Sequence, residues 1–355
     1  MNRADLKIHS LEEVSGEWDE LADHAGASPF LRRGWITAWL RAFGKGRLEI
    51  HSVRDGAHLI GLIPLLRHHG SLRSPTNAHT PEFGFLVRDP SAAGHLARAV
   101  VGHASEHLVI AAVGREDPGV VAMVSVAAEI RRPLLVRELG RSPYLTVRGS
   151  WERYEGQLHP KVRAEMRRRR RRLQERGRLS LEVVDGRDRL REYLDEGFRV
   201  EASGWKGRRS TAILSHPRSR GFYTDVAAWA AARGWLRLAF LRIDGRAVAF
   251  DYCLEQDGVH YLLKTGYDPS FRQFAPGMLL RREMLARAFE TRLRRYEFLG
   301  VADRWKLMWT DQLRERLRIH AFSRSMPGVM GWAAVAYGRP AVRRAKGAIR
   351  AAFRR

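Results

Sequence analysis

The alternation of apolar and polar positions from Trp235 to Tyr267 is the most informative pattern in the chain. Three strand-like runs there are joined by Asp244-Gly245 and Asp257-Gly258. Asp-Gly between apolar runs favours a two-residue type I′ turn, because both central residues of that turn need a positive φ. The pattern therefore predicts a three-stranded antiparallel meander.

An amphipathic helix is predicted directly after the meander. Pro276 stands where a first helical residue is expected, and Gly277 leaves the backbone beside it uncovered. A helix start with free N–H groups attracts phosphate oxygens. The order of meander, Pro-Gly step and helix suits a site that holds a phosphate-bearing acyl donor.

Two-residue turns would also fix the register of the second and third strands, with Asp251 opposite Lys264 and Cys253 opposite Leu262. Because side chains alternate, one face is then predicted to be core and the other to carry ionisable groups. The core face has Phe250, Tyr252, Leu254, Tyr261 and Leu263, and the other has Asp251, Glu255, His260 and Lys264. We interpret the second face as a cleft wall. A structural ion pair between Asp251 and Lys264 is the alternative.

The whole chain reads as two loosely repeated α/β halves. Each half contains helices, a strand–Asp-Gly–strand hairpin, a further helix and a strand, which indicates a degenerate duplication. We expect one domain at 1–150, a second at 151–325 and a basic amphipathic tail at 326–355. In each domain a mixed, mostly antiparallel sheet should be flanked by helices. Only the second copy keeps the full meander and the Pro-Gly step, so the chemistry is expected there.

Composition narrows the class of protein. A length of 355 residues with 45% hydrophobic and 29% charged positions fits two globular domains. The single cysteine, Cys253, excludes intrachain disulfides and a multi-cysteine metal site. The histidines lack zinc-ligand spacing, so no metal is expected. Without an apolar leader or a membrane-spanning run, we expect a cytoplasmic protein, with peripheral contact at the inner face of the membrane as a further option.

The formal net charge of +24 favours an anionic partner, but only seven of the 63 basic residues are lysines. An arginine bias of this kind can come from a GC-rich coding sequence alone. The lysines are therefore more informative, and Lys206 and Lys306 each follow a tryptophan. A compact ammonium can polarise a carbonyl in a way that a guanidinium fork does not. Chance placement of these lysines is the alternative.

Two basic segments have open interpretations. Arg167 to Arg172 cover every side of a helix predicted from Pro160 to Arg176, which is typical of a solvated face. An anionic acceptor, such as a nucleotide-linked or lipid-linked sugar, or a tRNA donor are the alternatives. The tail from Met326 joins a short apolar run to a basic end. It is either a loosely docked helix or a segment that lies on an anionic membrane.

Several segments together resemble the GNAT-like acyltransferases of the BioF2/CelD type, relatives of the Fem peptidyl transferases. The similar segments are 28–44, 201–207, 220–250, 261–271, 275–280 and 296–310. The resemblance implies tandem GNAT folds, the first one degenerate, and acyl-CoA, with acetyl-CoA foremost, as co-substrate beside the helix that follows the fourth strand. The stretch Arg272–Met278 corresponds to the pyrophosphate loop Gln/Arg-x-x-Gly-x-Gly/Ala but keeps only a small residue and one glycine.

These considerations define the candidate site residues. The N–H groups of Gly277 and Met278, with Arg272 and Ala275, would hold the donor phosphates. Lys264 and Lys306 are candidates for acceptor binding or carbonyl polarisation. Glu201, Asp251 and Asp303 are candidate bases. The candidate lining of the acceptor cleft comprises Trp205, Lys206, Tyr223, Tyr267 and Trp305.

Three functions are consistent with the sequence. The first is an N- or O-acyltransferase that moves an acyl group from acyl-CoA to an amine or hydroxyl of a sugar or polysaccharide precursor, by direct transfer in a ternary complex. The second is an aminoacyl-tRNA-dependent, Fem-like peptidyl transferase. The third is a non-catalytic module that binds nucleic acid or membrane.

Overall fold

The structure, a computed structural model, describes residues 5–103, 107–204 and 210–338. The chain forms two compact units that interleave along the sequence. Unit 1 comprises Met1–Arg33, Gly44–Leu139 and Glu315–Arg355, and unit 2 comprises Gly34–Phe43 and Gly140–Arg314. These units divide the chain at points other than residues 150 and 325. The expected domain boundaries at those two residues stay predictions.

Unit 1 contains a mostly antiparallel sheet in the order β1-β2-β3-β4-β6-β13, with β5 paired to β3. Only the β4–β6 pair within this order is parallel. Its strands are β1 (Asp5–His9), β2 (Arg47–Asp55), β3 (His58–His68), β4 (Ser71–Arg73), β5 (Leu86–Val87), β6 (His107–Gly114) and most of β13 (Leu313–Phe322). Its helices are α1 (Ser15–His24), α3 (Pro90–His103), α4 (Pro118–Glu129) and α12 (Met326–Ala333), with short turns at Pro29–Leu31 and Ala334–Gly338.

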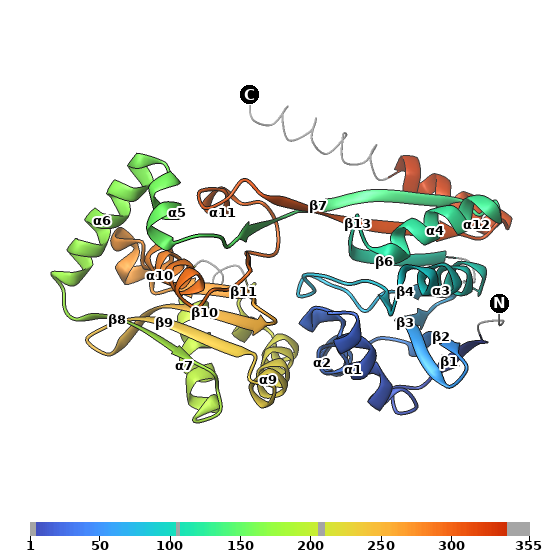
Figure 1. The fold of residues 1–355 in the computed structure, drawn as a ribbon, viewed down its shortest axis with the longest axis horizontal. Coiled ribbons are helices and arrows are strands. Elements are labelled where there is room, and N and C mark those ends of the chain that lie inside the picture. Colours follow the sequence, from blue (N-terminus) through green and yellow to red (C-terminus); the bar gives the residue numbers. More distant parts are fainter. Residues whose placement is uncertain (1–4, 104–106, 205–209, 339–355) are drawn as a thin grey trace. The chain divides into compact units, whose positions relative to one another are not determined.

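Unit 2 contains a second sheet in the order β7-β12-β11-β10-β9-β8. Its strands are the second half of β7 (Leu134–Thr146), β8 (Leu179–Val184), β9 (Leu236–Ile243), β10 (Arg246–Gln256), β11 (Val259–Tyr267) and β12 (Arg295–Glu297). Its helices are α2 (Arg33–Phe43), α5 (Trp151–Gln157), α6 (Pro160–Gln174), α7 (Leu190–Ala202), α9 (Pro217–Ala232), α10 (Pro276–Glu290) and α11 (Arg304–Leu307), with 3₁₀ turns at Ile213–Ser215 and Pro269–Phe274. Figure 1 labels these elements along the chain.

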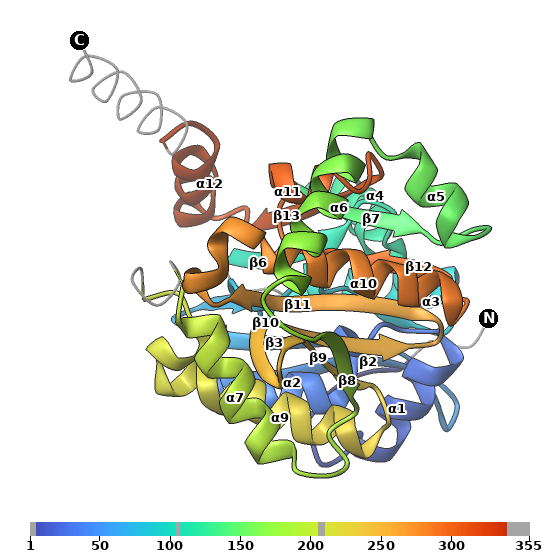
Figure 2. The ribbon, with the colours of Figure 1, turned by 90° about the vertical axis from the view of Figure 1, so that its left-hand side faces the viewer.

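The sheet of unit 2 has helices on both faces. Figure 2 shows α7 and α9 on one face and α10 on the other. On the α7 face, Phe250 of β10 packs so closely that a Cβ at Gly197 would lie 2.4 Å from its ring. On the α10 face, Cys253 and Leu262 belong to the buried cluster that includes Leu280. The predicted α/β class, with mostly antiparallel sheets flanked by helices, is confirmed.

The predicted meander forms β9, β10 and β11. Asp244 and Gly245 have φ values of 46° and 81°, and Asp257 and Gly258 have 48° and 71°, as type I′ turns require. The predicted register is right at Cys253, which pairs with Leu262. It is wrong beyond that point, because a bulge inserts one extra residue into β11.

The bulge changes which residues share a face. Asp251 pairs with Thr265, and Lys264 pairs with Tyr252. Leu263 is the extra residue, and a one-residue shift turns every later side chain of a strand to the opposite face. Lys264 therefore lies on the α7 and α9 side, and the predicted pairing of Asp251 with Lys264 does not form.

The apolar stripe of α2 belongs to the core of unit 2. The rings of Trp35 and Phe43 lie 5.1 Å and 5.3 Å from the ring of Phe222 on α9. At Gly34 a Cβ would lie 2.1 Å from the indole nitrogen of Trp229, so the two helices approach closely there. This packing places a segment from the first part of the chain in the second compact unit.

Candidate functional site

A cavity of about 630 Å³ opens in unit 2 where β11 and β12 separate. The two strands pair in parallel only from Val259 to Tyr261, opposite Arg295 to Glu297. Beyond Tyr261, no strand in the described part of the chain pairs with β11 on that side, and the start of α10 and the loop after β12 complete the walls. The cavity is lined by Arg169, Glu201, Gly204, Leu262, Leu263, Lys264, Thr265, Gly266, Tyr267, Arg272, Ala275, Gly277, Met278, Phe298, Asp303, Trp305 and Lys306.

The start of α10 forms one end of this cavity. Pro276 is the first helical residue, as predicted, and it follows Ala275, which has a left-handed backbone with φ 46°. The amides of Met278 and Leu279 both donate to the carbonyl of Ala275. Within the described part of the chain, no carbonyl accepts from the Gly277 amide. That N–H, rather than the predicted pair from Gly277 and Met278, is available to an anion.

Positive charge surrounds this helix start. Arg272 is exposed and lines the cavity, and Arg169 reaches the same cavity from α6. A Cβ added to Gly277 would lie 3.5 Å from the ring of Tyr267, which is ordinary contact. The glycine is therefore not required by packing, and its position leaves the amide uncovered. A helix N-terminus with two guanidinium groups nearby can hold phosphate oxygens.

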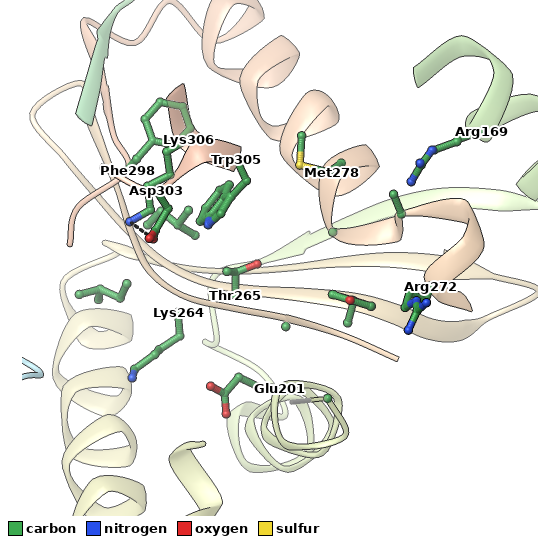
Figure 3. Close-up of a pocket in the computed structure, with 17 residues that line it drawn as sticks. Arg169, Glu201, Lys264, Thr265, Arg272, Met278, Phe298, Asp303, Trp305 and Lys306 are labelled. Atoms are coloured by element: carbon green, nitrogen blue, oxygen red, sulfur yellow. Dashed lines mark ion pairs between the residues drawn. The ribbon is translucent and has the colours of Figure 1, made fainter. Parts of the chain in front are cut away.

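Lys264 and Glu201 line the cavity on the other side of β11. Figure 3 shows both side chains on one side of the strand, with Thr265 and Trp305 on the opposite side. Glu201 is buried, and its Oε2 accepts the backbone N–H of Ile213 at 2.9 Å. Gly266 lets α7 approach β11, because a Cβ there would lie 2.4 Å from the Glu201 Cα. An ammonium and a carboxylate thus flank the strand where it faces the cavity.

Tyr223 is part of the core and does not line the cavity, contrary to its predicted place in the acceptor cleft. It is 1% exposed, and its carbonyl accepts the hydroxyl hydrogen of Tyr252 at 2.9 Å. Burial, followed by the negative charge of Glu201, raises the pKa of Tyr223 well above its usual value. Its neutral ring supports Lys264, whose ammonium lies 5.2 Å from the ring centroid.

Lys306 organises the loop that closes the cavity. Its Nζ donates to the carbonyls of Leu299 at 2.7 Å and Val301 at 2.9 Å, and it lies 3.6 Å from Oδ2 of Asp303. Two of the three N–H donors therefore bind carbonyls, and the Asp303 carboxylate lies close enough for an ion pair. At Gly300 a Cβ would lie 3.1 Å from Nζ, so the loop wraps closely around the charge. Lys306 is 7% exposed and still lines the cavity.

Asp303 and Trp305 complete this wall. The Asp303 side chain is 49% exposed, which makes it the most accessible of the predicted carboxylates in the cavity. The Trp305 ring lies 5.3 Å from the Lys306 ammonium and 5.8 Å from the guanidinium of Arg281. Two cations therefore hold the indole that borders the cavity.

Asp251 is not in the cavity, which corrects its prediction as a candidate base. It is fully buried and pairs with the equally buried Arg281 at 2.8 Å. Burial is the largest influence and would lower the pKa of Arg281, but the charge and hydrogen bond of Asp251, together with Tyr296 and Cys253, outweigh it, so the pKa is raised. The pair lies on the α10 side, one layer behind Trp305, and has a structural role there.

The other ionisable groups predicted for the cleft wall also form a closed network. Glu255 binds Arg237 and Arg287 and accepts a hydrogen bond at 3.0 Å from Nδ1 of His260 when that nitrogen is protonated. Burial would raise the pKa of Glu255, but the hydrogen bonds and charges of His260 and Arg287 bring it down to about 2. Neither Glu255 nor His260 lines the cavity.

Most arginines of the run on α6 already contact a carboxylate or an aromatic ring of the protein. Arg168 and Arg169 bind Glu165, Arg170 binds Glu283, Arg171 lies 4.0 Å from Glu175, and Arg172 lies over the ring of Phe274. Arg167 has no such carboxylate or ring partner among the described residues. Partners of this kind, some on α6 itself and some on neighbouring elements, support the solvated-face interpretation of the run.

The sequence did not single out Arg169 as a cavity residue. Arginines on every side of the helix hid its orientation. The buried residues Met166 and Leu173 give the missing signal, because Arg169 stands three positions after the first and four before the second. That spacing places it on the inward face of α6.

Trp205 and Lys206 lie outside the described residues, so their predicted role stays a prediction. Within the described ranges, no group of three His, Cys, Asp or Glu side chains could hold a metal ion. A search of the same residues found no helix with the length and apolar character needed to cross a bilayer.

Comparison with known proteins identifies the fold that carries this cavity. Residues 160–307 match the family model described as an acetyltransferase (GNAT) domain. Unit 2 contains a GNAT-like domain. The match includes α6, the meander, α10 and the Lys306 loop, so every described wall of the cavity lies inside the GNAT-like domain. No curated relative matches the chain by sequence.

Solved structures extend the likeness over most of the chain. FemX is 11% identical with a TM-score of 0.60, over 89% of this chain and 96% of that one. The C-terminal domain of a putative lysylphosphatidylglycerol synthetase from Agrobacterium fabrum is 13% identical with a TM-score of 0.56, over 93% and 96%. L-PGS from Bacillus licheniformis is 13% identical with a TM-score of 0.56, over 90% and 95%. These likenesses show a fold shared with FemX, which agrees with the GNAT-like, Fem-related fold that the resemblance implied.

Proposed function

We propose that the protein transfers an acyl group from acyl-CoA, with acetyl-CoA foremost, to an amine or hydroxyl of a sugar or polysaccharide precursor in the cytoplasm. The observation that carries this proposal is a single cavity with a helix start and two arginines at one end and an ammonium and carboxylates further along. The GNAT fold supports a transferase. The sugar acceptor comes from the resemblance to the BioF2/CelD type.

The donor would enter along the free edge of β11. Its phosphates would bind the Gly277 amide, Arg272 and Arg169 at the start of α10. From there an extended thioester arm can follow the peptide groups of β11 beyond Tyr261, as an added strand does at a sheet edge. This path leads from the α10 end to the part of the cavity lined by Phe298 and Trp305.

Transfer needs an aligned acceptor and a group that takes its proton. We assign acceptor binding to Lys264 and proton removal to Glu201, which lie on the same side of β11. The acceptor nitrogen or oxygen attacks the thioester carbonyl, the C–S bond breaks, and the acceptor proton passes to the carboxylate and then to the CoA thiolate. Asp303, on the opposite wall, is the second candidate for the base.

Lys306 would act through the loop it holds. Its Nζ already donates to two carbonyls and pairs with the Asp303 carboxylate at 3.6 Å, so the ammonium is held on its own loop. We therefore assign it the positioning of residues 299–303 and of Trp305, with its charge adding to the field at the acyl group.

A panel of CoA thioesters in a thermal-shift assay tests this proposal, followed by mass spectrometry of glycan acceptors incubated with the stabilising thioester. A ligand present at 100 times its Kd stabilises a protein by about 2.7 kcal/mol, which gives a clear rise in Tm. An acyl-modified glycan would confirm the transfer. An unchanged Tm with every thioester would refute acyl-CoA as the donor.

An aminoacyl-tRNA donor is the second candidate, since the Fem-type resemblance implies it and FemX shares the fold at a TM-score of 0.60. The arginine run on α6 would then bind the phosphates of the RNA. RNA binding that weakens steeply with salt and disappears when Arg167 and Arg171 are replaced by glutamine would favour this function. A non-catalytic module would instead bind RNA or liposomes without transferring an acyl group from any donor.

A further inference from the structure

The α12 segment of unit 1 carries several exposed apolar side chains. Met326 is 74% exposed, Met330 67% and Tyr337 66%, and Val329 is 43% exposed. From Ser325 to Gly338 the sequence contains no charged residue. An apolar patch without charges on an exposed helix indicates contact with another apolar phase.

The orientation of α12 is fixed by close contacts on its other side. At Gly328 a Cβ would lie 2.3 Å from the Ser323 carbonyl oxygen, and at Gly331 it would lie 3.5 Å from the Phe322 ring. The guanidinium of Arg137 on β7 donates to the carbonyls of Val335 and Ala336. The glycines and Arg137 hold the inward side, so Met326 and Met330 face solvent.

Positive charge on either side of this segment indicates which kind of partner it contacts. Arg324 precedes it, and the sequence from Arg339 to Arg355 contains seven basic residues and no acidic one. Nucleic acid would use the positive charge but not the exposed methionines. An anionic bilayer uses both, because apolar side chains enter the acyl boundary while each basic residue near the surface adds about 1 kcal/mol.

We infer that α12 places the protein on the surface of an anionic lipid bilayer, and that the basic sequence 339–355, which lies outside the described residues, adds charge attraction. This inference stands apart from the proposed acyl transfer, since it uses no residue of the cavity. The apolar side chains of α12 insert at the interface and the basic residues bind the anionic headgroups. Together they make the association depend on both apolar burial and salt.

Co-sedimentation of the full chain with vesicles tests the inference. Phosphatidylcholine vesicles containing phosphatidylglycerol are compared with phosphatidylcholine vesicles alone, at low and high salt. Binding to the anionic vesicles alone, weakened by high salt, is expected. The double variant Met326→Glu/Met330→Glu should lose affinity by at least about tenfold, equivalent to 1.4 kcal/mol, with an unchanged Tm.

The matched control is Val121→Glu/Val124→Glu on α4, which replaces two exposed apolar residues of the same unit at 61% and 45% exposure. It should bind vesicles as the wild type does. The inference is overturned by absent vesicle binding, by equal losses in the two double variants, or by equal affinity for neutral vesicles. A second copy of the chain is the competing occupant of α12. The inference is also overturned if the wild type does not bind vesicles and light scattering shows a dimer that the α12 variant dissociates.

Discussion

Lys264 lies opposite Tyr252 and not opposite Asp251, because β11 carries the extra residue Leu263. The bulge places Lys264 beside Tyr223 and leaves Asp251 to pair with Arg281 on the other face. Bulges re-aim side chains where they occur beside functional sites. One inserted residue thus separates a cavity ammonium from a buried structural carboxylate.

Replacing Lys264 by methionine should impair transfer without unfolding the protein. The side chain is half-buried and its ammonium only borders the core, so the free energy of unfolding should change by less than about 1 kcal/mol. The kcat/KM for the acceptor should fall by about 10- to 100-fold, with little change in CoA affinity. Lys264→Arg is the matched control for charge. Wild-type acceptor kinetics in Lys264→Met would remove this residue from the site.

Asp251→Asn should destabilise the protein, because Arg281 would stay buried without its carboxylate. The expected loss is about 3–5 kcal/mol in the free energy of unfolding, measured by denaturant titration. The double variant Asp251→Asn/Arg281→Met should recover part of that loss. CoA affinity of the folded fraction should be unchanged. Full stability with abolished turnover would show that Asp251 takes part in the reaction.

At Gly277, the equally shaped variants Gly277→Asp and Gly277→Asn separate the effect of charge on donor binding from the effect of side-chain size on packing. Gly277→Asp should weaken acetyl-CoA binding by at least about tenfold, because a carboxylate would repel the donor phosphates. An acidic residue in the first turn of a helix is favourable for stability, so Tm should not fall. Gly277→Asn has the same shape without the charge and should lose much less affinity. Equal affinities of the two variants, measured by calorimetry, would contradict a phosphate at this position.

Lys306→Met should disrupt the loop from Leu299 to Asp303. Two carbonyls would lose their charged donor, at a cost of about 2–4 kcal/mol, and kcat should fall by about 10- to 100-fold. The KM for acyl-CoA should change little, since the phosphate end of the cavity is unaffected. If kcat fell with stability unaltered, Lys306 would instead act on the acyl group directly.

The stability of the protein should depend on Glu255 in acid. Its pKa is lowered from 4.5 to about 2, so its contribution is fully present above pH 4.5 and is lost as the pH falls through 2. The contribution is on the order of 3 kcal/mol. Glu255→Gln should therefore destabilise the protein more at pH 6 than near pH 2. Urea unfolding of both proteins across this range measures the difference, and a constant difference would contradict the assignment.

The sequence predicted elements whose signals are local. The Asp-Gly turns and the Pro276 helix start were correct, because positive φ and a missing N–H are properties of single residues. It did not predict the bulge at Leu263, whose only signal is three-dimensional packing. For the same reason it placed Asp251 with Lys264 and missed the buried Arg281.

The structure brings part of the expected site together. The predicted residues Arg272, Gly277, Lys264, Glu201 and Lys306 do line one cavity. Tyr223 and Asp251 do not, because each finds its partner inside the core. Nor could the sequence show that the Lys306 ammonium binds its own loop, since those carbonyls belong to backbone that bends through Leu299 and Gly300 with φ values of 53° and 62°.

Calorimetric titration of the wild-type protein with acetyl-CoA and with acetyl-pantetheine, which lacks the phosphates, tests the central claim most directly. If the start of α10 holds a phosphate-bearing donor, acetyl-CoA binds at one site and acetyl-pantetheine binds at least about tenfold more weakly. Equal affinity for the two thioesters, or no heat from acetyl-CoA at all, would contradict the account.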